Sequence, residues 1–223
     1  MADTCKLNIQ RLSKVYFNQV FRTSTDKSGF IYFNLGCQID TYELRQIMVD
    51  LKKELSILAE KQFHKTLKYQ WLARFDQQEN TRYHLDNAQN PSFLMLGYEP
   101  SDIESRLSFA DYVKFSKDKG FSAADFFERY NPLFNDLSDV LSPYIISISN
   151  FDHRAFNIVL INNTNASSSM ETLGVLHKAE ILKPDQHKSR VVNSMMLNLI
   201  DPADDDTSAV DENYFLTTDK ISR

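Results

Sequence analysis

The chain has 223 residues, of which 42% are hydrophobic, and its 30 acidic and 25 basic side chains give a net charge of −5. This length suffices for one well-buried domain, and the composition excludes a chain that is disordered over most of its length. The acidic balance argues against a nucleic-acid partner, because such proteins present a basic face to the phosphates.

Residues 1–66 are expected to form a supporting region of helix and strand. Apolar residues recur at three- and four-residue intervals between residues 41 and 62, which predicts an amphipathic helix there. Asp40 or Thr41 is a suitable N-cap for this helix. A polar turn signal upstream precedes the aromatic run at residues 30–33, which we interpret as a strand.

From residue 67 the apolar period changes to two, and the segments become short. One further helix is expected over residues 122–130. This pattern predicts a mainly β fold with flanking α-helices, and we interpret residues 67–200 as a catalytic core built as a double-stranded β-helix (jelly roll or cupin-like). The acidic tail, residues 201–223, is expected to be loosely ordered, within a single domain overall. The strand candidates are 67–75, 82–84, 92–98, 106–115, 144–148, 156–161, 173–181 and 190–199.

The cellular compartment is suggested by what the sequence lacks. No apolar run reaches the length of a membrane span. Residues 1–6 do not have the charged-then-apolar layout of a signal peptide. The two cysteines, Cys5 and Cys37, are not in a Cys-x-x-Cys spacing, so a disulfide framework is not expected. We therefore expect a cytoplasmic protein that does not associate with membranes.

His84, Asp86 and the distant His177 form the most informative pattern in the chain. Two imidazoles and one carboxylate can hold a ferrous ion on one face and leave the opposite positions open for a co-substrate and oxygen. His84 and Asp86 are two positions apart, so both can reach one ion from a strand that runs into a turn. His177 lies in an apolar run that predicts a separate strand. The alternative is an ordinary turn and an unrelated core histidine.

Together with Arg190, which opens a further strand candidate, this order resembles the Fe(II)/2-oxoglutarate-dependent dioxygenases over about residues 67–200. That family has a His-x-Asp pair, a distant His, and a later basic residue that grips the far carboxylate of 2-oxoglutarate. The resemblance implies that His84, Asp86 and His177 bind Fe(II) as the catalytic metal, with 2-oxoglutarate as co-substrate and O2 as oxidant. It also implies hydroxylation of a C–H of a small-molecule substrate, such as an amino acid or another carboxylate, with succinate and CO2 as co-products.

Three residues are candidates for binding the co-substrate. Arg190 suits a carboxylate because its planar fork makes two parallel charge-assisted hydrogen bonds. Strand alternation puts Arg190, Val192 and Ser194 on one face. Many family members have a hydroxyl two positions after the Arg, where this chain has Val192, so we place that contact at Ser194. Arg82, two positions before His84, is expected to point into the same interior, and an internal salt bridge is its alternative role.

Two other functions compete with this interpretation. A cupin-like metal enzyme that does not use 2-oxoglutarate would keep the metal ligands but would not need Arg190. A non-catalytic β-sandwich binding module would make the motif a coincidence. Lys188 is a weaker rival to Arg190, because an ammonium group offers no bidentate match to a carboxylate. Tyr69 and Trp71 belong to an aromatic stripe that either is core or lines the substrate cavity.

Overall fold

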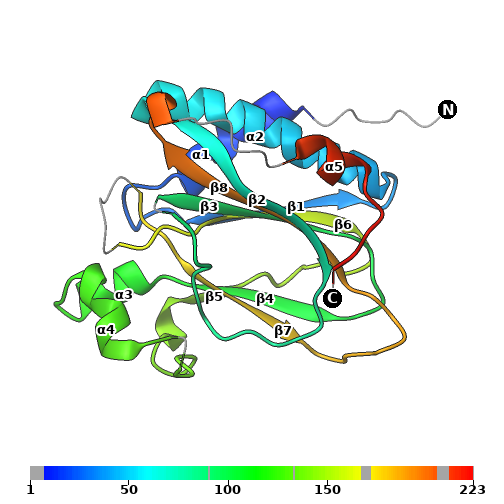
Figure 1. The fold of residues 1–223 in the computed structure, drawn as a ribbon. Coiled ribbons are helices and arrows are strands. Elements are labelled where there is room, and N and C mark those ends of the chain that lie inside the picture. The colour runs from blue at the N-terminus through cyan, green and yellow to red at the C-terminus, as the bar shows by residue number, and fades with distance from the viewer. Residues whose placement is uncertain (1–7, 90, 133, 167–171, 205–210, 223) are drawn as a thin grey trace.

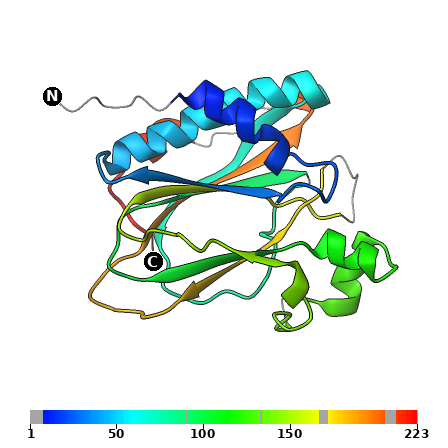
Figure 2. The same ribbon diagram turned by 180° about the vertical axis from the view of Figure 1, so that it is seen from behind.

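The computed structural model describes residues 8–89, 91–132, 134–166, 172–204 and 211–222. Two antiparallel sheets lie face to face, and helices cover the outer face of the larger sheet (Figures 1 and 2). The protein is therefore mainly β, as the sequence predicts. The helices are α1 (Ile9–Val20), α2 (Thr41–Phe63), α3 (Tyr112–Asp118), α4 (Phe126–Tyr130) and α5 (Glu212–Thr217), with short 3-10 turns at Ala123–Asp125, Ser142–Tyr144 and Pro202–Asp204.

The larger sheet has five strands in the order β1-β6-β3-β8-β2. Its three central strands are apolar on both faces, because one face packs against the helices and the other faces the second sheet. The smaller sheet has three strands in the order β5-β4-β7. The strands are β1 (Phe30–Gly36), β2 (Thr66–Asp76), β3 (Ser92–Tyr98), β4 (Ser105–Ala110), β5 (Ile145–Ser147), β6 (Phe156–Asn162), β7 (Leu176–Ile181) and β8 (Val191–Ile200).

The predicted helix at residues 41–62 corresponds closely to α2. Asp40 is its N-cap, and the side chains of Asp40 and Glu43 each bond the other residue's backbone N–H, which forms a capping box. Leu44, Met48 and Leu55 are fully or almost fully buried against the larger sheet. Within the described residues no helix is long and apolar enough to cross a membrane.

The C-terminal segment is ordered where the structure describes it, so the expectation of a loose tail is wrong for residues 211–222. Phe215 of α5 is 3% exposed and packs into the helix-side core. The buried guanidinium of Arg45 donates from Nη1 to the carbonyls of Phe215 (2.7 Å) and Thr218 (2.6 Å), which accounts for the docking of this helix end. Residues 205–210 of the tail, which include Asp205 and Asp206, lie outside the described residues.

Several predicted strands are shorter in the structure: the candidate at 173–181 begins at Leu176, and the candidate at 144–148 is reduced to Ile145–Ser147. The candidate at 106–115 ends at Ala110, because Asp111 accepts a hydrogen bond from the backbone N–H of Lys114 (2.9 Å) and caps α3. The candidate at 82–84 is not a regular strand, since only His84 forms a bridge, to His177.

A β-bulge in β2 decides which aromatic side chains face the second sheet. Tyr69 pairs with Leu197 and Trp71 with Met196, so Gln70 is an extra residue in β2. Tyr69 consequently packs in the helix-side core, whereas Trp71 packs between the sheets. Both rings therefore belong to core clusters, and neither lines the cavity that lies between the sheets.

Candidate metal centre

The two histidines of the motif are direct neighbours across an antiparallel bridge. The backbone N–H of His84 donates to the carbonyl of His177 (3.1 Å), and the N–H of His177 donates back to His84 (3.0 Å). A pair that exchanges both bonds places its side chains on the same side of the ladder. The two rings are accordingly close, with centroids 4.2 Å apart.

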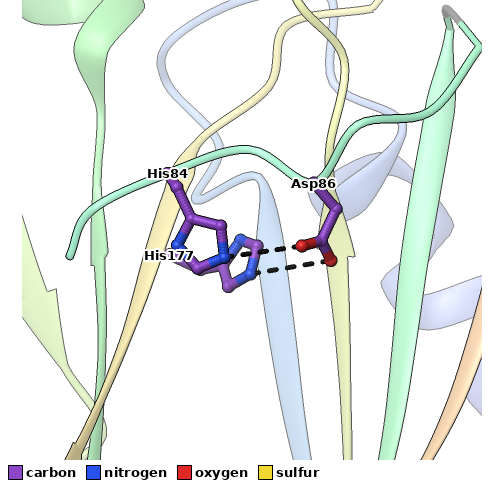
Figure 3. Close-up of side chains that lie close together, drawn as sticks. All are labelled: His84, Asp86 and His177. Carbon is purple, nitrogen blue, oxygen red and sulfur yellow. Dashed lines mark ion pairs between the residues drawn. The ribbon is translucent and has the colours of Figure 1, made fainter. Parts of the chain in front are cut away.

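Asp86 completes the cluster from the segment that leads to β3 (Figure 3). Its Oδ1 lies 3.4 Å from Nε2 of His84, and its Oδ2 lies 3.9 Å from Nε2 of His177. One potential ligand atom from each of the three residues lies within 4.8 Å of the others. The structure therefore brings together the three residues that the sequence assigns to a metal site.

The donor set fits a first-row divalent ion. Two atoms bound at about 2.1 Å and at right angles lie about 3 Å apart, so the two contacts of Asp86, at 3.4 and 3.9 Å, would shorten by less than about 1 Å on binding an ion. Nδ1 of His84 lies 2.8 Å from the carbonyl oxygen of Arg82. A proton on that nitrogen leaves the Nε2 lone pair directed at Asp86, which is the usual orientation of a ligating imidazole.

The protonation states of His177 and Asp86 also favour a cation. Burial and the neighbouring His84 lower the pKa of His177 to about 4, so its ring is neutral at physiological pH. Its contact with Asp86 is then not a salt bridge. Burial acts to lower the pKa of His84, but the contacts with Asp86 and the Arg82 carbonyl outweigh it and raise that pKa overall. Burial would raise the pKa of Asp86, yet the neighbouring imidazoles hold it below its ordinary value. A carboxylate beside a neutral imidazole is thus available as a ligand.

A cavity of about 180 Å³ lies between the two sheets, and the cluster lines part of its wall. The remaining wall is mostly apolar, with side chains from both sheets. A space of this size holds several water molecules or one small ligand. The lining residues outside the cluster include Leu94, Leu96, Tyr98, Phe109, Val159 and Ser194.

Arg190 lies directly before β8 and is 3% exposed. Its guanidinium carbon lies 4.9 Å from the ring centroid of Tyr98. The Nε atom donates a hydrogen bond to the Oγ of Ser105 (3.1 Å). The Nη1 atom donates to the backbone carbonyl and to the side-chain oxygen of Gln77. Both Tyr98 and Gln77 line the cavity. The hydrogen-bond partners are neutral oxygens, and Nη2 has no partner among the described residues. A buried cation with an unused donor is suited to an anionic ligand.

Val192 and Ser194 line the cavity, in agreement with the predicted alternation, whereas Arg190 precedes β8 and is not among the lining residues. The Oγ of Ser194 accepts a hydrogen bond from the indole N–H of Trp71 (3.2 Å). Because that nitrogen can only donate, the hydroxyl proton of Ser194 remains free for another acceptor.

Arg82 does not lie where the sequence predicts. Its side chain is exposed, so the expectation that it points into the interior with His84 is wrong. The prediction assumed regular strand alternation, but residues 81–89 form only the isolated bridge at His84. Arg82 contributes its backbone carbonyl to the site through the contact with the His84 ring.

Sequence reasoning did not identify the residues that hold Arg190 and Asp86 in place. Gln77, Tyr98 and Ser105 surround the guanidinium, and they come from three separate parts of the chain. Asn163 binds the backbone of Asp86. The only sequence signal for it is the Asn-Asn pair at the end of a predicted strand.

No family model and no curated protein sequence matches this chain.

Proposed function

We propose that this protein is a non-haem Fe(II)/2-oxoglutarate-dependent dioxygenase that hydroxylates a C–H of a small molecule, such as an amino acid or another carboxylate. One observation carries the proposal: the His/Asp/His cluster lines a cavity between the two sheets, and directly behind Tyr98 and Gln77 of the same wall lies a buried arginine with an unused donor. The cluster suits a ferrous ion, and the arginine suits the far carboxylate of the co-substrate.

The strand order supports a double-stranded β-helix. From β2 onward the chain moves to the His84 segment beside β7, then to β3, β4, β5, β6, β7 and β8. The strands β2, β3, β6 and β8 lie in the larger sheet, whereas β4, β5, β7 and the His84 segment lie on the side of the smaller one. In this arrangement β1 is an addition at the edge of the larger sheet. This alternation between two sheets supports the proposal of a jelly roll.

Each residue of the site has a distinct part in the proposed reaction. O2 would be the oxidant, activated at the ferrous ion: one of its oxygen atoms would enter the C–H bond of the substrate, and the other would enter succinate as 2-oxoglutarate loses CO2. His84, Asp86 and His177 hold the ion from one side. Arg190 binds the distal carboxylate of the co-substrate and so fixes its orientation, and Ser194 offers a hydroxyl proton to a ligand oxygen. The apolar walls keep bulk water out of the cavity.

Turnover of 2-oxoglutarate is the direct test. Purified protein with added ferrous iron and ascorbate should convert 2-oxoglutarate to succinate, and a metabolite panel should reveal the substrates that accelerate it. The matched control is His84→Ala, which lacks one ligand. Metal binding without any 2-oxoglutarate binding would instead favour a cupin-like metal enzyme, and absence of metal binding would favour a non-catalytic β-sandwich module.

A further inference from the structure

Asp86 is the only member of the cluster without a backbone partner in a strand or bridge, within the part of the chain that the structure describes. Instead, one side chain binds both of its backbone polar groups. The Oδ1 of Asn163 accepts from the N–H of Asp86 (2.8 Å), and the Nδ2 of Asn163 donates to the carbonyl of Asp86 (3.0 Å). These two bonds reproduce what a neighbouring strand would supply.

Asn163 is itself held firmly. It directly follows β6 and is 2% exposed. Its backbone N–H donates to the carbonyl of Ser92 (2.9 Å), and the second proton of its Nδ2 goes to the Oγ of Ser92 (3.0 Å). Both amide protons and the amide oxygen are therefore in use. Only asparagine and glutamine offer two amide donors and a carbonyl acceptor on one side chain, and glutamine is longer by one methylene.

We propose that Asn163 is a positioning residue for the metal centre: it fixes the backbone of Asp86 so that the carboxylate is directed at His84 and His177. The proposal rests on the metal centre of the proposed function, but not on the use of 2-oxoglutarate. Residues 85–89 form no regular strand, so without this clamp the carboxylate would sample several orientations. Groups that orient metal ligands typically contribute about 10- to 100-fold to metal affinity.

Asn157 provides a matched control at the opposite end of β6. It is fully buried, and its amide also makes three hydrogen bonds: Nδ2 donates to the carbonyls of Asp152 (2.8 Å) and Ala155 (2.7 Å), and Oδ1 accepts from the hydroxyl of Tyr32 (2.8 Å). It contacts none of the cluster residues. Removal of either amide leaves buried polar groups unpaired and lowers stability. Only the loss of Asn163 should also weaken metal binding.

The experiment measures Co(II) affinity by calorimetry, the visible spectrum of the Co(II) protein, and thermal unfolding of the metal-free protein. The variants are Asn163→Ala, Asn163→Ser and Asn157→Ala, beside the unaltered chain. We expect Asn163→Ala and Asn163→Ser to bind Co(II) about 10- to 100-fold more weakly, with an altered spectrum because carboxylate ligation is impaired. Asn157→Ala should show a lower unfolding temperature but an unchanged Co(II) affinity and spectrum.

Each other outcome overturns a specific part of this assignment. If the unaltered chain does not bind Co(II), the metal centre is wrong, and the proposed function fails with it. If it binds Co(II) and Asn163→Ala binds equally well, only the positioning role is wrong. Equal losses in Asn157→Ala and Asn163→Ala, or failure of both Asn163 variants to fold, would show that Asn163 serves the fold rather than the site.

Discussion

His84 and His177 lie far apart in the sequence but exchange both of their backbone hydrogen bonds, at 3.1 and 3.0 Å. The bridge is isolated, so no regular ladder explains it. Its consequence is that two imidazoles share one side and stand 4.2 Å apart between ring centroids. The relative placement of the two potential ligands is therefore set by the backbone, and it does not depend on an ion being bound.

Replacing His84 by Ala should abolish Fe(II) binding and leave the fold intact. The side chain is 22% exposed and lies outside the hydrophobic clusters, so its loss should change the free energy of unfolding by less than about 1 kcal/mol. Metal content after reconstitution and urea unfolding would be measured together. His187→Ala, which removes an exposed histidine from a turn, is the control and should keep full metal binding. Unfolding of the unaltered protein by a chelator would contradict the view that the strands, and not the metal, maintain the fold.

Much of the larger sheet could be predicted because its strands are apolar and bounded by turn residues. The candidates at 92–98 and 156–161 agree with β3 and β6 within one residue. The assignment of each side chain to one face of its sheet was reliable only where the strand is regular. Strand alternation correctly puts Ser194 in the cavity. In β2 the extra residue Gln70 reverses the faces of the residues on either side of it, and at Arg82 there is no strand to which alternation could apply.

The helices α1, α3 and α5 were not predicted, and the physical reasons differ between α3 and α5. The α3 segment contains Val113 and Phe115, which look like strand residues until Asp111 is recognised as an N-cap. The α5 helix has only six residues and is stabilised by tertiary contacts, including the Arg45 guanidinium at its end.

The metal motif could be found in the sequence because its residue types are chemically restrictive. Gln77, Tyr98 and Asn163 could not, because their roles exist only once distant segments meet.

Acid should destabilise the protein partly through Glu99. Burial would raise the pKa of this carboxyl, but hydrogen bonds from Arg74, Thr41 and Asn193 outweigh it and hold the pKa below its ordinary value of 4.5. The charged carboxylate therefore contributes stability at pH values above 4.5, and this contribution is lost as the pH falls through the lower folded value. Glu99→Gln should reduce stability at neutral pH by about 1–3 kcal/mol and should make unfolding less dependent on pH in the acid range.

Urea unfolding between about pH 7 and about pH 3 measures this effect. Glu128→Gln, at an exposed carboxylate on α4, is the control, and its stability should depend on pH in the same way as that of the unaltered protein. If Glu99→Gln retains the full acid dependence of the unaltered chain, the ion pair with Arg74 is not a source of that dependence.

Gly174→Ala should destabilise the protein because a methyl group has no room there. An added Cβ would lie 2.1 Å from the backbone oxygen of Thr164, and backbone atoms cannot move aside as a flexible side chain can. The expected cost is about 1–3 kcal/mol or more, the range for overpacking a buried position. Gly120→Ala is the comparison: its Cβ would meet nothing within 4 Å, and only its positive φ of 75° carries a cost, of about 1–2 kcal/mol. A smaller loss at Gly174 than at Gly120 in urea unfolding would contradict this account of the close approach.

Arg190→Ala should selectively weaken 2-oxoglutarate binding. The substitution removes a buried guanidinium whose Nη2 has no partner among the described residues, while the metal cluster keeps all its members. The expected cost is about 2–4 kcal/mol, or an affinity that is weaker by about thirty- to a thousandfold. Arg190→Lys should recover only part of the affinity, because an ammonium group cannot reproduce the bidentate fork. The affinity for Co(II) alone should remain that of the unaltered chain.

Arg74→Ala separates this specific effect from the general cost of losing a buried arginine. Arg74 pairs with Glu99 at 3.1 Å, and its side chain is 8% exposed, so its removal should lower the stability at least as much as Arg190→Ala does. It should nevertheless leave 2-oxoglutarate affinity unchanged. The hydrogen-bond partners of Arg74, Glu99 and Asp219, do not line the cavity, whereas Gln77, a partner of Arg190, does. Calorimetric titration of 2-oxoglutarate into the Co(II)-loaded proteins distinguishes the loss of this specific contact from a general loss of stability. Equal affinities in Arg190→Ala and the unaltered chain would remove Arg190 from the co-substrate site. Absence of binding in the unaltered chain would leave a metal protein whose buried arginine serves another anion.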